Sequence, residues 1–96
     1  MSSPEFVLYH FAREEPGSAR VGFAIGRRLG GAVVRNRIRR QLREAVRPLI
    51  PRLAACDIVI VARPPALEAG VVALETALTD AAGRAGLLDE REGIST

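Results

Sequence analysis

Hydrophobic positions divide the chain into five segments, of which three have the spacing of β-strands. Residues 6–11 are a short run of strand formers, ended by a polar loop with a Pro16-Gly17 turn signal. Residues 20–26 alternate bulky and small side chains, as a strand with two different faces does. Because the connection between these two segments is short, we expect them to pair as an antiparallel hairpin. Residues 57–63 hold a continuous apolar run that stops at a proline pair, which is typical of a strand buried on both faces.

Two further segments have the period of α-helices. The first begins near residue 32 or 33 and ends by Pro51, with apolar side chains in one narrow stripe and arginines opposite. The stripe consists of Val34, Ile38, Leu42, Ala45 and Leu49. The second runs from about residue 68 to residue 84 and stops at Gly86, which suits a left-handed helix end. Its expected buried positions are Val71, Leu74, Leu78, Ala81 and Ala85. The order strand, strand, helix, strand, helix predicts an α+β two-layer sandwich.

Charge is distributed very unevenly along this pattern. All 14 cationic residues are Arg, and nine of them lie between Arg27 and Arg52 beside a single acid, Glu44, so this segment has a formal charge of 9 − 1 = +8. The other 70 residues (96 − 26) have five Arg and ten acids, which gives 5 − 10 = −5. A charge run on a helix is usually a solvated face, but a one-signed and nearly unpaired run costs stability through repulsion. We therefore expect a polyanionic partner, and nucleic acid is the commonest.

Composition argues against several classes of protein. The 96 residues predict one domain, which we place at residues 1–88 with a tail at 89–96. No apolar run approaches the ~18 residues of a membrane span, and the N-terminus does not have the pattern of a signal peptide. The lone Cys56 cannot form an internal disulfide and fits a reducing compartment, which predicts a cytoplasmic protein.

The candidate chemical groups are few and scattered. His10 is the only histidine, and we expect it on the sheet or surface because a metal site needs three or four ligands. Cys56 has no second cysteine nearby, so a small buried thiol is expected. The carboxylates do not cluster as they do in nucleases that hold two Mg²⁺ ions. We expect no catalytic residue and no metal site in this chain.

Residues 30–44 read GGAVVRNRIRRQLRE and resemble the signature of the protein subunit of bacterial ribonuclease P. The Arg-Asn-Arg core at 35–37 follows Gly-x-Ala-Val and precedes a basic pair with Arg-Glu. Other segments that stand at the spacing of that family extend the resemblance to about residues 6–85, namely 6–9, 20–22, 27–28 and 57–64. The resemblance implies a small mixed sheet with a left-handed βαβ crossover, similar to ribosomal-protein domain 2, which is an exception to the usual right-handed connection.

The resemblance also implies a function. Proteins of this family bind the catalytic RNA of ribonuclease P and the 5′ leader of precursor tRNA, and they assist endonucleolytic removal of the leader. Catalysis and the Mg²⁺ it needs then belong chiefly to the RNA. Carried over by position, the RNA-subunit contacts are Arg35, Asn36, Arg37, Arg39, Arg40, Arg43 and Arg47. The residues of the leader-binding cleft are Tyr9, Arg27, Arg28 and Arg63.

The chain departs from the family pattern in two respects. Family members normally begin with a further basic segment and an N-terminal helix, whereas this chain starts at the next strand. Either the start of the sequence is mis-assigned, or the chain is shortened, in which case we expect one cleft wall to be missing and Tyr9 to be exposed. Gly31 also replaces the usual Asn, and Gly26 replaces the usual Ser. The alternative function is a non-catalytic ribosomal or translation-associated RNA-binding domain. A DNA-binding protein is disfavoured because no helix-turn-helix pair precedes the arginine helix, and a self-sufficient nuclease because metal ligands are lacking.

Overall fold

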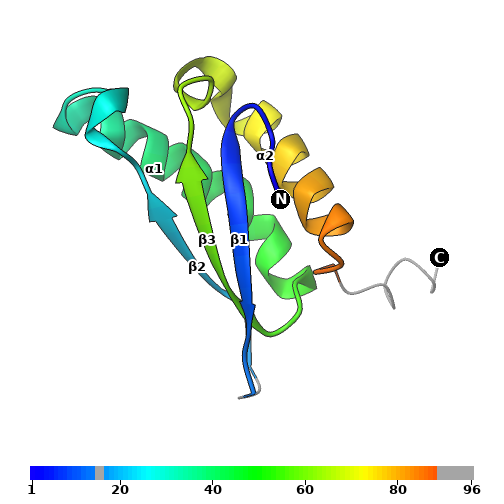
Figure 1. Ribbon diagram of the computed structural model, residues 1–96. Helices are drawn as coiled ribbons and strands as arrows, with labels where there is room; N and C mark the ends of the chain where they lie inside the picture. Colours follow the sequence, from blue (N-terminus) through cyan, green and yellow to red (C-terminus); the bar gives the residue numbers. More distant parts are fainter. Residues whose placement is uncertain (15–16, 89–96) are drawn as a thin grey trace.

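The computed structural model describes residues 1–14 and 17–88, so the predicted tail at 89–96 and part of the Pro16-Gly17 turn lie outside the described residues. The strands are β1 (Phe6–Ala12), β2 (Arg20–Ala24) and β3 (Cys56–Ala62). The helices are α1 (Ala32–Val46) and α2 (Ala66–Arg84), with short 3₁₀ turns η1 (Arg27–Leu29) and η2 (Arg47–Arg52) on either side of α1. Both helices cover the same face of the sheet (Figure 1), which confirms the predicted two-layer sandwich.

The strand order β1-β3-β2 shows that the predicted hairpin is wrong. β1 pairs antiparallel with β3 and β2 pairs parallel with β3, so that Tyr9 and Gly22 both lie opposite Val59. The segment between β1 and β2 passes two strand spacings, about 10 Å, which seven residues span easily. The most apolar strand takes the centre, where both of its edges form hydrogen bonds. β1 and β2 follow one another in the sequence but do not pair, because β3, the last strand along the chain, lies between them.

The unit β2-α1-β3 has a left-handed crossover. In Figure 1 the helices lie behind the sheet, β2 and β3 point the same way, and β3 lies to the right of β2. Seen from the helix side, the chain thus moves to the left as it passes from β2 through α1 to β3. This hand is opposite to that of almost all parallel βαβ units, and it confirms the expectation that came from the family resemblance.

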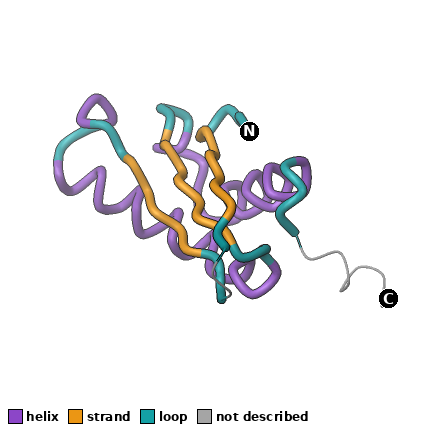
Figure 2. The backbone as a smooth tube through the Cα atoms, turned by 60° about the horizontal axis from the view of Figure 1, so that its bottom comes forward, coloured by secondary structure: helices purple, strands orange, loops and turns teal. Residues whose placement is uncertain are grey.

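The hydrophobic core lies between the sheet and the helices, and Figure 2 shows these two layers from a second direction. Of the predicted α1 stripe, Ile38, Leu42, Ala45 and Leu49 are buried and Val34 is half-buried. In α2 the buried residues are Ala66, Leu74, Leu78, Ala81 and Ala82, whereas the predicted Val71 and Ala85 are half-buried. The strands contribute their alternate residues, chiefly Phe6, Leu8, Ile58 and Ile60.

One face of the sheet has no helix over it among the described residues. Along β3 the residues alternate between buried and half-buried, so the predicted burial on both faces is correct only for the helix side. The same alternation places residues 7, 9 and 11 of β1 and residues 20, 22 and 24 of β2 on the uncovered side, which we call the open face. The first residues of the chain pair back onto β1, where the Met1 and Leu8 backbones exchange two hydrogen bonds of 2.8 and 2.7 Å.

The entry to α1 depends on one glycine. Gly30 has φ 141, a conformation that side chains rarely adopt. A Cβ at this position would lie 2.9 Å from the side chain of Val34, which is too close for an ordinary contact. The chain can therefore turn from η1 into α1 within two residues, and this sharp turn brings the arginines of both segments together.

Candidate nucleic-acid interface

The outer face of α1 is cationic along its whole length. The apolar stripe is turned to the core, so the intervening positions point to solvent, where Arg37, Arg40 and Arg43 are exposed and Arg35 and Arg39 are half-buried. The face continues into η2 with the exposed Arg47. We call these six residues the arginine face, and none of them forms an ion pair with a described residue. Within the described part of the chain, the one side-chain hydrogen bond of the arginine face is donated by Arg39 Nη1 to Asn36 Oδ1 at 3.3 Å.

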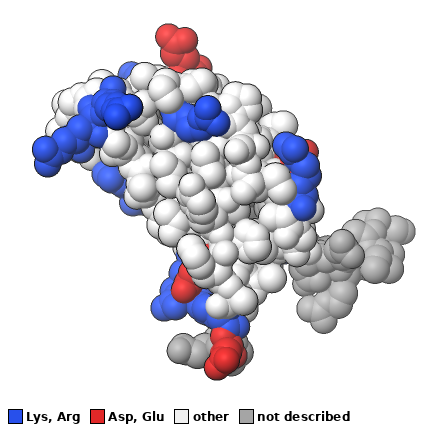
Figure 3. Space-filling view, in the orientation of Figure 1, with Lys and Arg blue, Asp and Glu red and all other residues white. Residues whose placement is uncertain are grey.

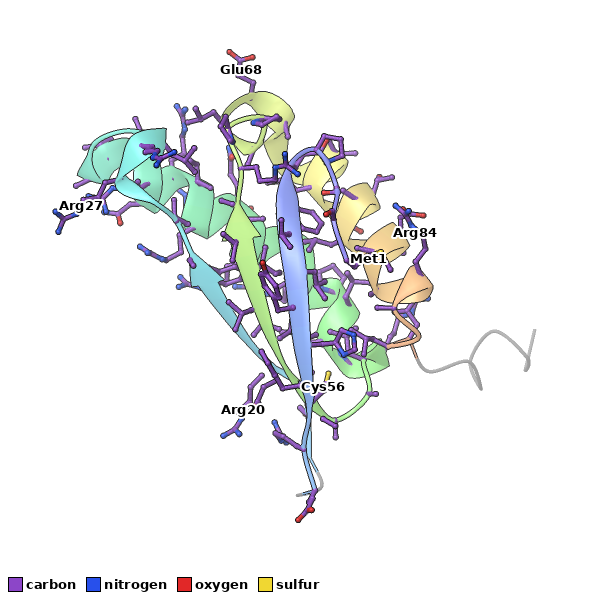
Figure 4. All side chains as sticks on the ribbon, in the orientation of Figure 1. Met1, Arg20, Arg27, Cys56, Glu68 and Arg84 are labelled. Carbon is purple, nitrogen blue, oxygen red and sulfur yellow. The ribbon has the colours of Figure 1, made fainter. Side chains whose placement is uncertain are left out.

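The arginine face continues past the beginning of α1. Arg27 and Arg28 are exposed on η1, and Arg27 stands at the outer edge of the molecule (Figure 4). The α1 N-terminus has no side-chain cap and no acidic residue in its first turn. Its free N–H groups and partial positive charge add to the field of the neighbouring guanidiniums.

The open face presents an aromatic residue, as predicted. Tyr9 is 51% exposed, and its cross-strand neighbours in the same row are Val59 and Gly22. The β2 residues near it on this face, Gly22 and Ala24, have small side chains or none, so the Tyr9 ring protrudes above this part of the sheet. Figure 3, which views this face, shows a mostly uncharged middle with cationic groups toward the upper left and a mixture of cationic and acidic groups at the lower edge.

The predicted cleft residues Arg27, Arg28 and Arg63 lie at one end of the sheet. β2 and β3 are parallel, so η1 and Arg63, which follow these strands, leave from the same end. Arg63 is exposed, its backbone N–H donates to Glu5 O at 2.9 Å, and its Nη1 donates to Ser3 O at 3.4 Å. The structure therefore brings three of the four predicted cleft residues to one end and places Tyr9 in the middle of the sheet.

The opposite end of the open face holds a charged group that was not predicted. Asp57 Oδ1 and Oδ2 accept hydrogen bonds from Arg20 Nε at 2.9 Å and Nη2 at 3.3 Å, and Arg13 Nη1 lies 3.4 Å from Oδ1. The hydrogen bonds from Arg20, followed by those from Arg13, lower the pKa of Asp57. The signal available in the sequence was a charged residue at the start of each of two strands.

The remaining titratable groups do not form a site in the part of the chain that the structure describes. His10 is exposed, and Cys56 is a buried free thiol whose pKa is raised by burial and then by the Asp57 carboxylate. Among the described residues no three His, Cys, Asp or Glu side chains gather where a metal ion could bind. The helices of residues 1–14 and 17–88 are also all too short or too polar to cross a bilayer.

An arginine face without ion pairs to described residues, an aromatic open face and a left-handed crossover are together typical of a small nucleic-acid-binding α+β domain. A protein-family model described as Ribonuclease P matches residues 1–86. The chain therefore belongs to the ribonuclease P protein family, and it is the protein subunit of this tRNA-processing ribonucleoprotein.

Individual relatives agree with this assignment. The ribonuclease P protein component of Symbiobacterium thermophilum is 49% identical over 88 residues, which are 90% of this chain and 76% of the relative. The same component of Bacillus cereus strain B4264 is 36% identical over 84 residues, covering 86% and 73% of the two chains. The solved RNase P protein of Staphylococcus aureus superposes with a TM-score of 0.80 at 28% identity, over 92% of this chain and 81% of that one.

Proposed function

We propose that this chain binds the catalytic RNA of ribonuclease P through the arginine face and the single-stranded 5′ leader of precursor tRNA on the open face. The observation that carries this proposal is the continuity of the two surfaces. The arginine face begins at the end of the sheet where Arg27, Arg28 and Arg63 stand, and Tyr9 follows next along the open face. One protein surface can thus hold two RNA segments side by side.

Phosphate contacts would supply most of the affinity for the catalytic RNA. A guanidinium fork matches phosphate geometry and stays charged at every physiological pH. The arginines are anchored on a helix whose opposite stripe is buried, so their backbone positions are fixed before RNA arrives. The exposed Asn36 adds an amide beside Arg39, which suits a base edge or a ribose hydroxyl.

Stacking would hold the leader. A base placed on the Tyr9 ring loses water from both apolar surfaces, and this interaction accepts any base because each has a π-face. The three arginines at the end of the sheet would bind the phosphates that precede or follow the stacked base. A leader of any sequence could therefore be held, as a subunit that serves many different tRNA precursors requires.

Cleavage of the leader would depend on groups that the RNA provides. The open face of the described chain has one central carboxylate, Asp57, and two guanidiniums already occupy its oxygens. This donor set does not fit a Mg²⁺ ion, which prefers several free oxygen ligands. We place the Mg²⁺ ions chiefly on the RNA and assign the protein the tasks of neutralising phosphate repulsion and orienting the leader.

A reconstitution experiment tests the proposed function. Precursor tRNA is incubated with Mg²⁺ and either this protein, a bacterial ribonuclease P RNA, or both. We expect no cleavage with the protein alone, and a higher kcat/KM with both components than with the RNA alone at moderate salt. Cleavage at the mature 5′ end by the protein alone would contradict the assignment of chemistry to the RNA, and an unchanged kcat/KM with both would contradict the proposed function.

A further inference from the structure

The open face presents a second aromatic ring. Phe11 is 57% exposed and lies two residues after Tyr9 on β1, so both rings project from the same side of the sheet about 7 Å apart. The other two phenylalanines differ: Phe6 is fully buried and Phe23 is half-buried against the core. A sheet with exposed aromatics at alternate positions is the arrangement on which RNA-binding sheets stack successive unpaired bases.

Phe11 shares its row of the sheet with a guanidinium. The register places Asp57 opposite Phe11 and Arg20 opposite Asp57, so an aromatic ring, a carboxylate and an arginine follow one another across the three strands. The neighbouring row consists of Tyr9, Val59 and Gly22. The second row thus places a guanidinium near an aromatic ring, which the first row does not.

Asp57 fixes the position of Arg20 without cancelling the positive charge of the group that it forms with Arg13 and Arg20. One carboxylate stands between two guanidiniums, so the group of Arg13, Asp57 and Arg20 has a net charge of 2 − 1 = +1. Arg20 uses its Nε and Nη2 for Asp57, and no described residue accepts a hydrogen bond from its Nη1. The side chain is 68% exposed, so the remaining N–H donors can reach a ligand.

We propose that Phe11 and Arg20 form a second binding position for single-stranded RNA at the far end of the open face. Phe11 stacks on a base, Arg20 binds an adjoining phosphate, and Asp57 is the positioning residue that orients the guanidinium. This inference rests on the proposed function, in which the leader begins at the arginine end and passes Tyr9. The Phe11 position therefore binds leader nucleotides further from the arginine face than those on Tyr9.

An unpaired strand fits this surface better than a duplex. Stacking on a protein ring requires a base whose face is free, and bases inside a helix are already stacked on each other. A duplex would touch the row through phosphates alone and leave the Phe11 ring in water. Two exposed rings at alternate positions of one strand, on the same face of the sheet, match the consecutive bases of an extended chain.

A nuclear magnetic resonance experiment can observe the ring directly. The full chain has three phenylalanines and one tyrosine, so ¹³C labelling of these rings gives a simple spectrum with a signal set for each. On addition of a single-stranded oligoribonucleotide of about ten nucleotides, the Phe11 signals should shift and those of the buried Phe6 should not. Shifts at Tyr9 with unchanged Phe11 signals would overturn the second position.

Affinity measurements with two substrates test the role in the holoenzyme. Precursor tRNAs with leaders of about two and about ten nucleotides are compared, since one-domain single-strand sites span about 4–16 nucleotides. Phe11→Leu, which keeps the apolar contact and removes the ring, should weaken binding of the long leader about fivefold or more and leave the short one unchanged. Arg20→Gln should have the same selectivity, and Arg20→Lys should restore part of the affinity.

Arg84→Gln is the matched control for Arg20→Gln. Arg84 is also an exposed arginine paired with an aspartate, Asp80 at 2.6 Å, but it lies on α2 away from the open face (Figure 4). Equal losses for Arg84→Gln and Arg20→Gln would overturn the proposal in favour of a general charge effect.

If the Phe11 and Arg20 variants bind long leaders like the unaltered protein while Tyr9→Leu does not, the second position fails and the proposed function stands. If Tyr9→Leu also has no effect, the leader site as a whole fails.

Discussion

Asp57 accepts hydrogen bonds from Arg20 and Arg13, and both neighbours favour its ionised form, so its pKa lies below the ordinary value of 3.8. A carboxyl whose pKa is lower in the folded state stabilises the fold at pH values above its unfolded pKa. That contribution is lost as the pH falls through the folded pKa. It is modest here because the side chain is 40% exposed and water screens the pair.

Replacing this carboxylate should therefore have a pH-dependent effect on stability. Asp57→Asn should unfold at a lower urea concentration than the unaltered protein at pH 7, and the difference should shrink as the pH falls from about 5 to about 3. Urea unfolding followed by circular dichroism measures this difference. The effect should also be smaller in an Arg20→Gln background, because the two changes remove the same contact. A difference that stays constant into acid would contradict stabilisation by these ion pairs.

Single residues could be predicted from the sequence where their place depended on helical periodicity. The apolar stripe of α1 determines which positions face solvent, so Arg40 and Arg43 lie where they were expected. Phe11, Arg20 and Asp57 were missed, because their common row exists only when β3 lies between β1 and β2. The amino-acid pattern of each strand contains no information on its neighbours, and the predicted hairpin leaves no place for Asp57 between Phe11 and Arg20.

α1 combines two functions in one element, because one face fills the core and the other is free of ion pairs with described residues. The double substitution Arg40→Ala with Arg43→Ala should weaken binding to the ribonuclease P RNA and reduce the salt slope of the association constant by about 2. The free energy of unfolding should change by less than about 0.5 kcal/mol for each exposed site. Filter binding and thermal unfolding measure the two quantities, and Arg84→Ala serves as the control. A loss of helical circular dichroism would mean that these side chains contribute to the core.

At the level of elements, both helices and all three strands were expected close to their observed positions, because each has enough periodic residues to identify its type. What failed was the pairing of strands. A short connection favours a hairpin in general, but burial of the most apolar segment at the centre of the sheet outweighs that preference here. The partial exposure of one side of β3 likewise depends on whether a second layer of helices covers that face. The run of apolar residues in β3 contains no information on this point.

For the whole molecule, Arg27 and Arg28 extend the arginine face toward the end of the open face, and binding should be strongly salt-dependent. If about six phosphates are engaged, the logarithm of the association constant with the ribonuclease P RNA should fall with the logarithm of salt concentration at a slope near −5. Titrations between about 50 and 200 mM salt measure the slope. A slope shallower than about −2 would show that few of these arginines contact phosphate.

The hand of the crossover could be predicted only through the family resemblance. General rules favour a right-handed connection between parallel strands by a wide margin, and periodicity and charge contain no information on handedness. The resemblance in residues 30–44 was specific enough to overrule the general preference. The location of the arginine face relative to the open face depends on this hand, because it decides the side of the sheet on which α1 lies.

The strand order also determines when the sheet can form as the chain is synthesised. Tyr9 pairs with Val59, 50 residues later, and β2 likewise has no partner until β3 has been made. Neither β1 nor β2 can pair with another strand of the sheet before β3 exists, so the three-stranded sheet must wait until β3 has left the ribosome. Such non-local pairing slows folding, and until then the arginine helix is a free cationic segment beside the RNA of the ribosome that makes it.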